Sequence, residues 1–309
     1  MAYRLSLADD VPSSVRACAR EQLGQAAALL ADPGADPVDA VHEVRKHLKK
    51  TRSLLRLARP ALGRRDYRER NAQLRELGLA LSGARDADVL AQTVAQLAEH
   101  AAGRLPAVDF EQLRAALAEE AAAARAATEA GGARDDVVAR LRAAAEQVGD
   151  WPLDGAGWDD LVAGAARAYG RGREALAAAR AQPTDDRMHA WRKRVKDLWY
   201  HQRLLTPAWP EPIGALATEA HALSELLGDD HDLALLRGRI ERGIALGPAA
   251  GADADELLAL IDARREQLRA QAWPLGERLY AERPKAYARR LRRILHSAVE
   301  QHRAADAAA

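Results

Sequence analysis

Two short stretches of the sequence combine a histidine with closely spaced arginine and lysine residues. Residues 41–52 read V-H-E-V-R-K-H-L-K-K-T-R, in which one glutamate accompanies a run of basic and titratable groups. The pattern His-x-x-Arg-Lys-x-x-Lys occurs again at 189–196. Arginine binds two oxygens with one planar fork and lysine acts as a mobile point charge, so this combination suits phosphate. Both stretches therefore indicate a binding site for a phosphate-bearing anion.

Each stretch divides into an apolar side and a basic side when it is drawn as a helix. Val44, Leu48 and Leu55 fall on the core-facing side of the first, as Trp191 and Val195 do in the second. Like charges four residues apart repel each other by a few tenths of a kcal/mol, and an extended anion would relieve this repulsion. The candidate anion-binding residues are His42, Arg45, Lys46, Lys49, Lys50, Arg52 and Arg56 in the first stretch and His189, Arg192, Lys193, Lys196 and Arg203 in the second.

The two histidines occupy the same place in the two stretches. Bound phosphate favours the protonated form of a neighbouring imidazole, because opposite charges stabilise each other. We therefore expect His42 and His189 to act as additional donors when they are protonated.

The duplication extends beyond these stretches. Asp39 to Lys49 and Asp186 to Lys196 match at a constant offset of 147 residues. Downstream, the block at 81–88 is answered by 226–232 at an offset of 144 or 145. Two such matches in the same order predict two duplicated halves, residues 1–148 and 149–309, each a helical bundle. A linker-like stretch at 148–157 separates them.

Composition places the chain in the all-α class. Alanine, leucine, arginine and glutamate dominate its 309 residues, and aromatic residues make up only 4%. The following helices are expected: 13–31, 37–59, 65–82, 86–101, 109–130, 134–148, 158–181, 185–205, 212–227, 231–246, 253–281 and 285–304. A signal peptide and a long apolar stretch are both missing from the sequence, so we expect a soluble, cytoplasmic protein without membrane association.

Basic charge is concentrated although the chain as a whole is nearly neutral. The 46 Lys/Arg and 45 Asp/Glu residues leave a formal net charge of +1. Between positions 41 and 75, however, twelve basic residues face three acidic ones, a local net charge of +9. A second cluster at 283–293 contains six basic residues and no acid. Charge sorted in this way creates a local field that attracts polyanions. Whether Arg85 and the 283–293 cluster join the two stretches is left open by the sequence.

The H-x-x-R-x-x-x-K-K-x-R pattern of the first half and the H-x-x-R-K-x-x-K pattern of the second resemble the signature of the CHAD family, the conserved-histidine α-helical domain. The resemblance covers nearly the whole chain. It implies two helical bundles related by a pseudo-twofold axis, whose basic helices face a shared cleft. It also implies binding of inorganic polyphosphate and association with polyphosphate granules. The matching positions are His42, Arg45, Lys49, Lys50 and Arg52 in the first half and His189, Arg192, Lys193 and Lys196 in the second.

The chain departs from the family pattern at two positions. His47 lies inside the first motif, and Asp197 replaces the second of the paired basic residues in the second motif. An acid at that position predicts weaker binding by the second half. The E-x-E-x-K signature of the triphosphatase domain that often accompanies the family is absent, so this activity is not implied.

Three other functions would use some of the same residues. Nucleic acid carries the same phosphates, although a single-strand binder usually interleaves aromatic residues among its cations. An acidic protein partner would also fit a basic surface. A metal-dependent phosphohydrolase would need ligands from Gly228 to Asp232, together with His201 or His221, but the block reads more simply as a helix stop followed by a capping aspartate. Because no acid/base pair or phosphate loop is evident, we expect a binding module without cofactor or metal, not an enzyme.

Overall fold

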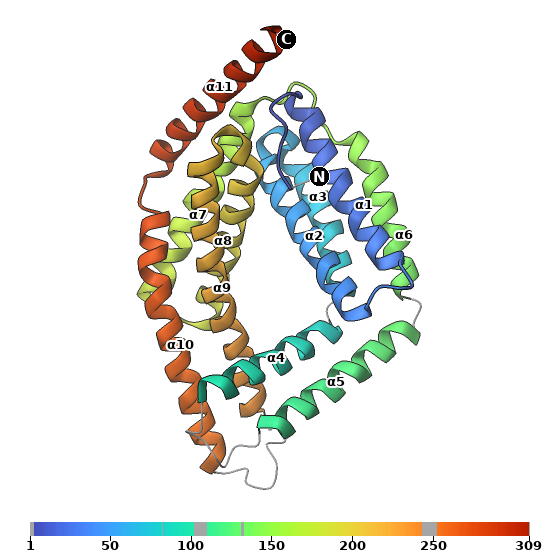
Figure 1. Ribbon diagram of the computed structural model, residues 1–309, viewed down its shortest axis with the longest axis vertical. Helices are drawn as coiled ribbons and strands as arrows, with labels where there is room; N and C mark the ends of the chain where they lie inside the picture. Colours follow the sequence, from blue (N-terminus) through green and yellow to red (C-terminus); the bar gives the residue numbers. More distant parts are fainter. Residues whose placement is uncertain (1–2, 82, 102–109, 131–132, 243–251, 309) are drawn as a thin grey trace.

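The computed structural model of the chain describes residues 3–81, 83–101, 110–130, 133–242 and 252–308 (Figure 1). These residues form eleven α-helices and two 3-10 helices and contain no strand, which confirms the all-α class. The α-helices are α1 (Val11–Ala31), α2 (Pro37–Leu57), α3 (Arg59–Ala80), α4 (Gly83–Ala101), α5 (Phe110–Ala130), α6 (Ala133–Glu146), α7 (Trp158–Ala181), α8 (Asp185–Leu205), α9 (Pro210–Glu241), α10 (Ala252–Leu279) and α11 (Pro284–Ala308), and the 3-10 helices are η1 (Gln147–Asp150) and η2 (Thr206–Ala208).

Several helices begin where the sequence places a capping side chain. Asp36 accepts hydrogen bonds from the backbone amides of Val38 and Asp39 at 2.9 and 3.0 Å, and Pro37 occupies the first turn of α2. Thr184 caps α8 in the same manner. These side chains satisfy amides that have no partner inside the helix, so the starts of α2 and α8 are fixed locally.

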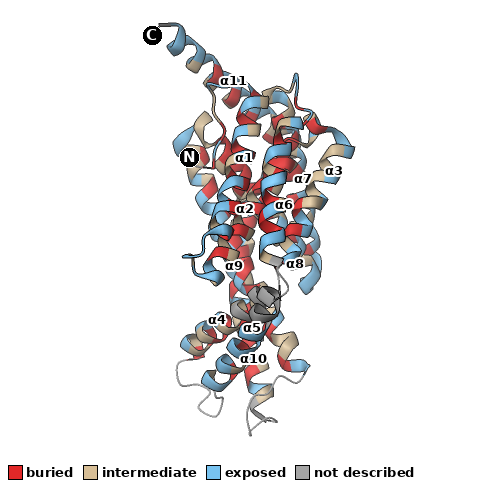
Figure 2. Cartoon of the chain, turned by 90° about the vertical axis from the view of Figure 1, so that its right-hand side faces the viewer, coloured by how far each residue is buried: buried red, intermediate tan, exposed pale blue. Residues whose placement is uncertain are grey.

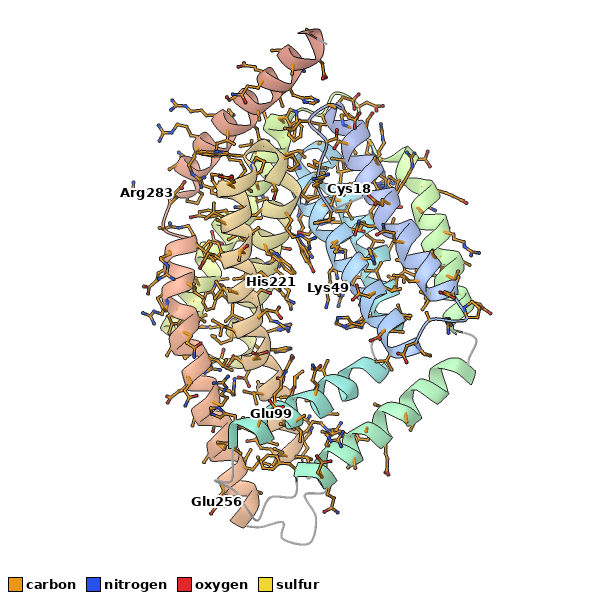
Figure 3. The ribbon with its side chains drawn as sticks, viewed as in Figure 1. Cys18, Lys49, Glu99, His221, Glu256 and Arg283 are labelled. Atoms are coloured by element: carbon orange, nitrogen blue, oxygen red, sulfur yellow. The ribbon has the colours of Figure 1, made fainter. Side chains whose placement is uncertain are left out.

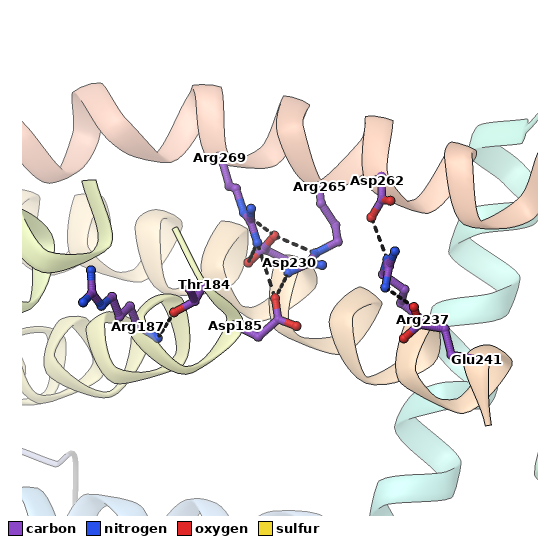
Figure 4. Close-up of polar contacts among 9 residues, drawn as sticks. All are labelled: Thr184, Asp185, Arg187, Asp230, Arg237, Glu241, Asp262, Arg265 and Arg269. Atoms are coloured by element: carbon purple, nitrogen blue, oxygen red, sulfur yellow. Dashed lines mark hydrogen bonds and ion pairs between the residues drawn. The ribbon is translucent and has the colours of Figure 1, made fainter. Parts of the chain in front are cut away.

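The predicted break at Gly228 is wrong, because α9 continues through it to Glu241. Asp230 does not cap a new helix; its buried carboxylate binds the guanidinium groups of Arg265 and Arg269 on α10 (Figure 4). Gly228 instead allows the side chain of Arg192 on α8 to approach closely. A Cβ atom at Gly228 would lie 3.2 Å from Arg192 Nη2.

The helices form two groups that lie side by side (Figure 1). Helices α1, α2, α3 and α6 pack together, and α7 to α11 form the second group. The groups meet where α2 contacts α7 and α8 and where α3 contacts α7. At this contact the α7 backbone at Gly164 lies so close to α2 that a Cβ atom would stand 1.8 Å from the carbonyl oxygen of Leu57. Only glycine fits such an approach.

Two hydrophobic cores hold the molecule together. The larger core extends through both groups and includes Leu54 and Leu57 of α2 as well as Trp191 and Leu204 of α8 (Figure 2). The smaller core lies where α4 and α5 cross the end of the molecule and contact α9 and α10. The hairpin of α4 and α5, which belongs to the first half of the sequence, therefore packs on helices of the second half.

Candidate functional site

The basic residues of α2, which we call the first row, are His42, Arg45, Lys46, Lys49, Lys50, Arg52 and Arg56. The predicted core-facing side of this helix is confirmed, since Val44, Leu48, Thr51 and Leu55 are all buried. The row lies beside this stripe, and its cations are exposed or half-buried. Figure 3 shows Lys49 at the edge of the space between α2 and the α8–α9 pair, with His221 of α9 on the other side of that space.

Neutral groups of α3 hold two arginines of the first row in place. Arg45 Nη1 donates a hydrogen bond to the carbonyl oxygen of Gly78 at 2.9 Å, and Arg52 Nε donates to Asn71 Oδ1 at 3.1 Å. Both of these hydrogen bonds use neutral acceptors. In contrast, Lys46 forms an ion pair of 2.7 Å with Glu43 on its own helix. The pKa of Arg52 falls to about 10, chiefly because of burial and then because of the charge of Arg56.

The basic residues of α8, which we call the second row, are His189, Arg192, Lys193, Lys196 and Arg203. Burial, followed by the charge of Arg192, lowers the pKa of Lys196 to about 8. The pKa of Lys193 is lowered by burial and then by Arg194, with Arg52 of α2 and Arg75 of α3 also contributing. In the described part of the chain, no carboxylate lies within ion-pair distance of either lysine.

The two rows approach each other closely enough to interact. The charge of Lys46 on α2 contributes to the lowered pKa of Lys196 on α8. Near the other end, Arg203 lowers the pKa of Lys50, for which burial is the larger cause. Both of these cations also lie over the ring of Tyr3, at 5.9 Å for Lys50 Nζ and 5.6 Å for the Arg203 guanidinium. The fold therefore gathers most of the predicted site residues around one interface.

Arg56 has a different environment from the rest of the first row. Its Nη1 atom forms an ion pair of 3.0 Å with Asp197 of α8, and Arg194 Nη1 lies 3.1 Å from the other carboxylate oxygen. Asp197 is only 3% exposed. The adjacent His201 Nε2 lies 3.0 Å from the carbonyl oxygen of Ser53 on α2. Asp197 thus joins the two groups of helices, and its carboxylate binds Arg56 and Arg194.

His189 stacks on His231 of α9, with ring centroids 4.1 Å apart. Burial, followed by the charges of Lys193 and Arg192, lowers the pKa of His189 to about 4. The pKa of His231 falls to about 3, again mainly through burial. In the structure His189 is therefore neutral at pH 7, and the expected role of its protonated form applies only where a bound anion raises this pKa. His47, the other unusual histidine, lies in the core with Nδ1 2.9 Å from Gln22 Oε1.

The residues that could have formed a metal site are directed elsewhere. Asp230 binds arginines of α10 (Figure 4), and His201 contacts the backbone of α2. His221 stacks on Trp199 with a centroid distance of 4.2 Å. Over the described ranges, no group of three or more His, Cys, Asp or Glu side chains is placed to hold a metal ion. The metal-dependent alternative therefore has no assembled centre in this part of the chain.

Sequence reasoning did not identify the acidic neighbours of the second row. Glu225 and Asp232 of α9 both act to raise the pKa of Lys196, although burial and Arg192 outweigh them. The same two acids raise the pKa of Asp229, after burial. Glu225 and Asp232 lie 29 and 36 residues after Lys196 in the sequence, so no spacing rule connects them with the row. The Arg85 side chain lies outside the described residues.

Every helix within the described residues is too short or too polar to cross a bilayer.

Comparisons with known proteins agree with this architecture. The family model of the CHAD domain matches residues 14–241, so the chain belongs to the CHAD family. The structure of PptA from Streptomyces chartreusis is similar, with a TM-score of 0.60 and 15% sequence identity over 89% of this chain and 100% of that chain. The CHAD domain from the plant Ricinus communis has a TM-score of 0.53 and 19% identity over 96% of this chain and 93% of that chain. No curated protein sequence gives a significant match.

Proposed function

We propose that the chain binds inorganic polyphosphate between the first row and the second row. One observation carries this proposal: Lys50 of α2 and Arg203 of α8 lie over the same Tyr3 ring, and no carboxylate of the described residues pairs with Lys193 or Lys196. Holding like charges close together costs free energy, and a polyanion between the rows would offset that cost. Family membership supports this ligand, because polyphosphate binding is what resemblance to the family implies.

The two halves, 1–148 and 149–309, would each supply one wall of the binding surface. At 1.5 Å per residue the first row from His42 to Arg56 extends over roughly 21 Å, a length suited to an extended chain of phosphates. Lysines act as mobile contacts, and arginines held by α3 act as fixed forks. The protein then serves as a binding module without catalysis, located in the cytoplasm and at polyphosphate granules.

Nucleic acid is the main alternative, and the aromatic residues near the rows argue against it. Trp191 is completely buried and stacks on Trp273 at 5.1 Å. Trp199 is stacked with His221 and lies 5.6 Å from the guanidinium of Arg203. Both rings are already engaged with protein side chains, whereas a single-strand site needs aromatic faces for bases. An acidic protein partner would bind the same rows, and the competition titration below distinguishes it from polyphosphate.

The test is a competition titration. Labelled long-chain polyphosphate is displaced by single-stranded DNA of equal total charge, by an acidic peptide, by heparin and by orthophosphate at fixed ionic strength. We expect unlabelled polyphosphate to compete at least tenfold better than each of the others, and log K to fall linearly with log salt concentration. Equal competition by DNA or by the peptide would contradict the proposal.

A matched control separates the rows from general charge. Arg64, Arg65 and Arg68 are exposed on α3 and lie outside both rows. Changing these three to Gln removes the same charge as Arg45→Gln, Lys46→Gln and Lys49→Gln. Only the second set should reduce the number of counterions released on binding. If both sets lower the salt slope equally, the anion is attracted by the overall field and not by the rows.

A further inference from the structure

The basic cluster at 283–293 is separate from the two rows in its contacts. It lies at the start of α11, which packs on α7 and η2, whereas the rows lie on α2 and α8. Figure 3 shows Arg283 at the outer side of the second group of helices, while Lys49 faces the space between the groups. The cluster must therefore be considered by itself.

One side of α11 forms a hollow with the residue that follows η2. The residues that line it, which we call the Trp209 hollow, are Trp209, Ala286, Arg289, Arg290, Arg293 and Ile294. Their spacing along α11 places the five helical residues on one face opposite the indole. Trp209 is 52% exposed, an unusual condition for the largest apolar side chain.

The charges of the hollow are only partly neutralised. Arg290 Nε forms an ion pair of 2.8 Å with Glu282. Arg292 pairs with Asp159 at 2.7 Å and is not among the residues that line the hollow. For Arg289 and Arg293, the described residues supply no carboxylate at ion-pair distance. Two unpaired guanidinium groups four residues apart repel each other, so a ligand with negative charge would stabilise them.

An exposed indole beside two arginines without carboxylate partners favours a ligand that carries an aromatic group as well as negative charge. Inorganic polyphosphate would use the arginines and leave the indole in water. A nucleobase stacks on an aromatic face whatever its identity, and its phosphates bind guanidinium groups. The basic residues from Lys285 to Arg293 extend along roughly 12 Å of α11, longer than one nucleotide needs. This length favours a strand over a mononucleotide.

We propose that the Trp209 hollow binds single-stranded nucleic acid, with one base stacked on Trp209 and the flanking phosphates on Arg289 and Arg293. The hollow is distinct from the proposed polyphosphate site, where the aromatic rings are engaged with protein side chains. The two ligands would then bind to the same molecule at different places.

The experiment compares two oligonucleotides of equal length and charge, a labelled oligothymidylate and its abasic analogue, by fluorescence anisotropy on the full chain. Trp209→Ala should weaken oligothymidylate binding by about fivefold or more, the effect of losing one stacked base, and leave binding of the abasic strand unchanged. Trp209→Phe should retain part of the difference. Because Trp209 is exposed, the melting temperature of both variants serves as the check on folding.

Charge is tested by a second pair of variants. Arg289→Gln with Arg293→Gln should weaken binding of both strands, whereas Arg292→Gln with Arg303→Gln, which removes the same charge from α11 outside the hollow, should weaken them less. Neutralising Lys193 and Lys196 should leave the effects of the Trp209 and Arg289/Arg293 variants on strand binding in place. A negative result at the Trp209 hollow is therefore distinguishable from a negative result for the polyphosphate proposal. A Trp209→Ala variant that binds both strands as the parent does would overturn the proposal. The proposal would also be overturned if an acidic, tryptophan-containing peptide or anionic phospholipid vesicles bound as tightly as oligothymidylate and lost this binding in Trp209→Ala.

Discussion

The first row and the second row share the pattern His-x-x-Arg-Lys-x-x-Lys, yet their surroundings differ. Neutral oxygens of Gly78 and Asn71 orient Arg45 and Arg52 of the first row, while Lys46 and Arg56 pair with Glu43 and Asp197. The second row lies beside carboxylates of α9, and two of them, Glu225 and Asp232, act on Lys196. A phosphate that approaches Lys196 therefore also meets the negative charge of these two carboxylates, which burial and Arg192 outweigh in setting the pKa of Lys196. The comparison teaches that the strength of a basic row depends on its neighbours as much as on its own charges.

The largest expected effect concerns Asp197, which sits between the rows. Asp197→Asn leaves Arg56 and Arg194 partly buried without a counterion, since their side chains are 21% and 17% exposed. Removing one partner of a buried pair costs about 3–5 kcal/mol, and we expect the low end of that range because both arginines reach solvent. Chemical denaturation measures this loss.

The control for Asp197 is Asp159→Asn, which breaks the exposed contacts with Arg292 and His296. That change should cost no more than about 1 kcal/mol. If the two variants are equally stable, Asp197 does not stabilise the contact between the two groups of helices.

The second prediction addresses the first row. The triple variant Arg45→Gln, Lys46→Gln, Lys49→Gln should weaken the binding of long-chain polyphosphate by at least about a hundredfold. Each charge-assisted hydrogen bond contributes about 1.5–3 kcal/mol. Isothermal titration at low salt measures the loss. Circular dichroism checks that the total helix content is unchanged. A loss no larger than that of the corresponding second-row variant would contradict the difference proposed between the rows.

The third prediction uses chain length. A ligand that bridges both rows gains from the effective concentration of its second contact. The triple variant Arg192→Gln, Lys193→Gln, Lys196→Gln should therefore weaken the binding of long chains by about tenfold. This loss is smaller than that of the first-row variant because Glu225 and Asp232 act on Lys196. Tripolyphosphate bound at the first row should be nearly unaffected. If short and long chains lose affinity to the same extent, the rows act as separate surfaces.

Much of this arrangement could be predicted from the sequence, because helical periodicity alone decides which side of α2 faces the core. The contacts between the two groups of helices could not. Asp197 and His201 belong to a second buried side of α8 that forms only against α2, and a helical wheel has no information about that contact. Gly228 and Asp230 give a local signal for a helix end, but α10 supplies Arg265 and Arg269 as partners for the carboxylate. Local propensity was therefore outweighed by packing.

The smallest effect is a dependence on pH above neutrality. Lys196, with a pKa of about 8 in the free protein, is charged at pH 7 and mostly neutral at pH 9. Bound phosphate favours the charged form and raises this pKa, so binding at pH 9 must take up a proton and affinity falls as pH rises through 8. The fall should be about fivefold between pH 7 and 9 and cannot exceed about tenfold per pH unit for a single group. Lys196→Arg keeps its charge throughout this range and should flatten the profile, whereas Lys49→Arg, at an exposed position of the first row, should not. A profile that is unchanged in Lys196→Arg would show that Lys196 is not in contact with the ligand, and the second row would then bind through Arg192 and Lys193 alone.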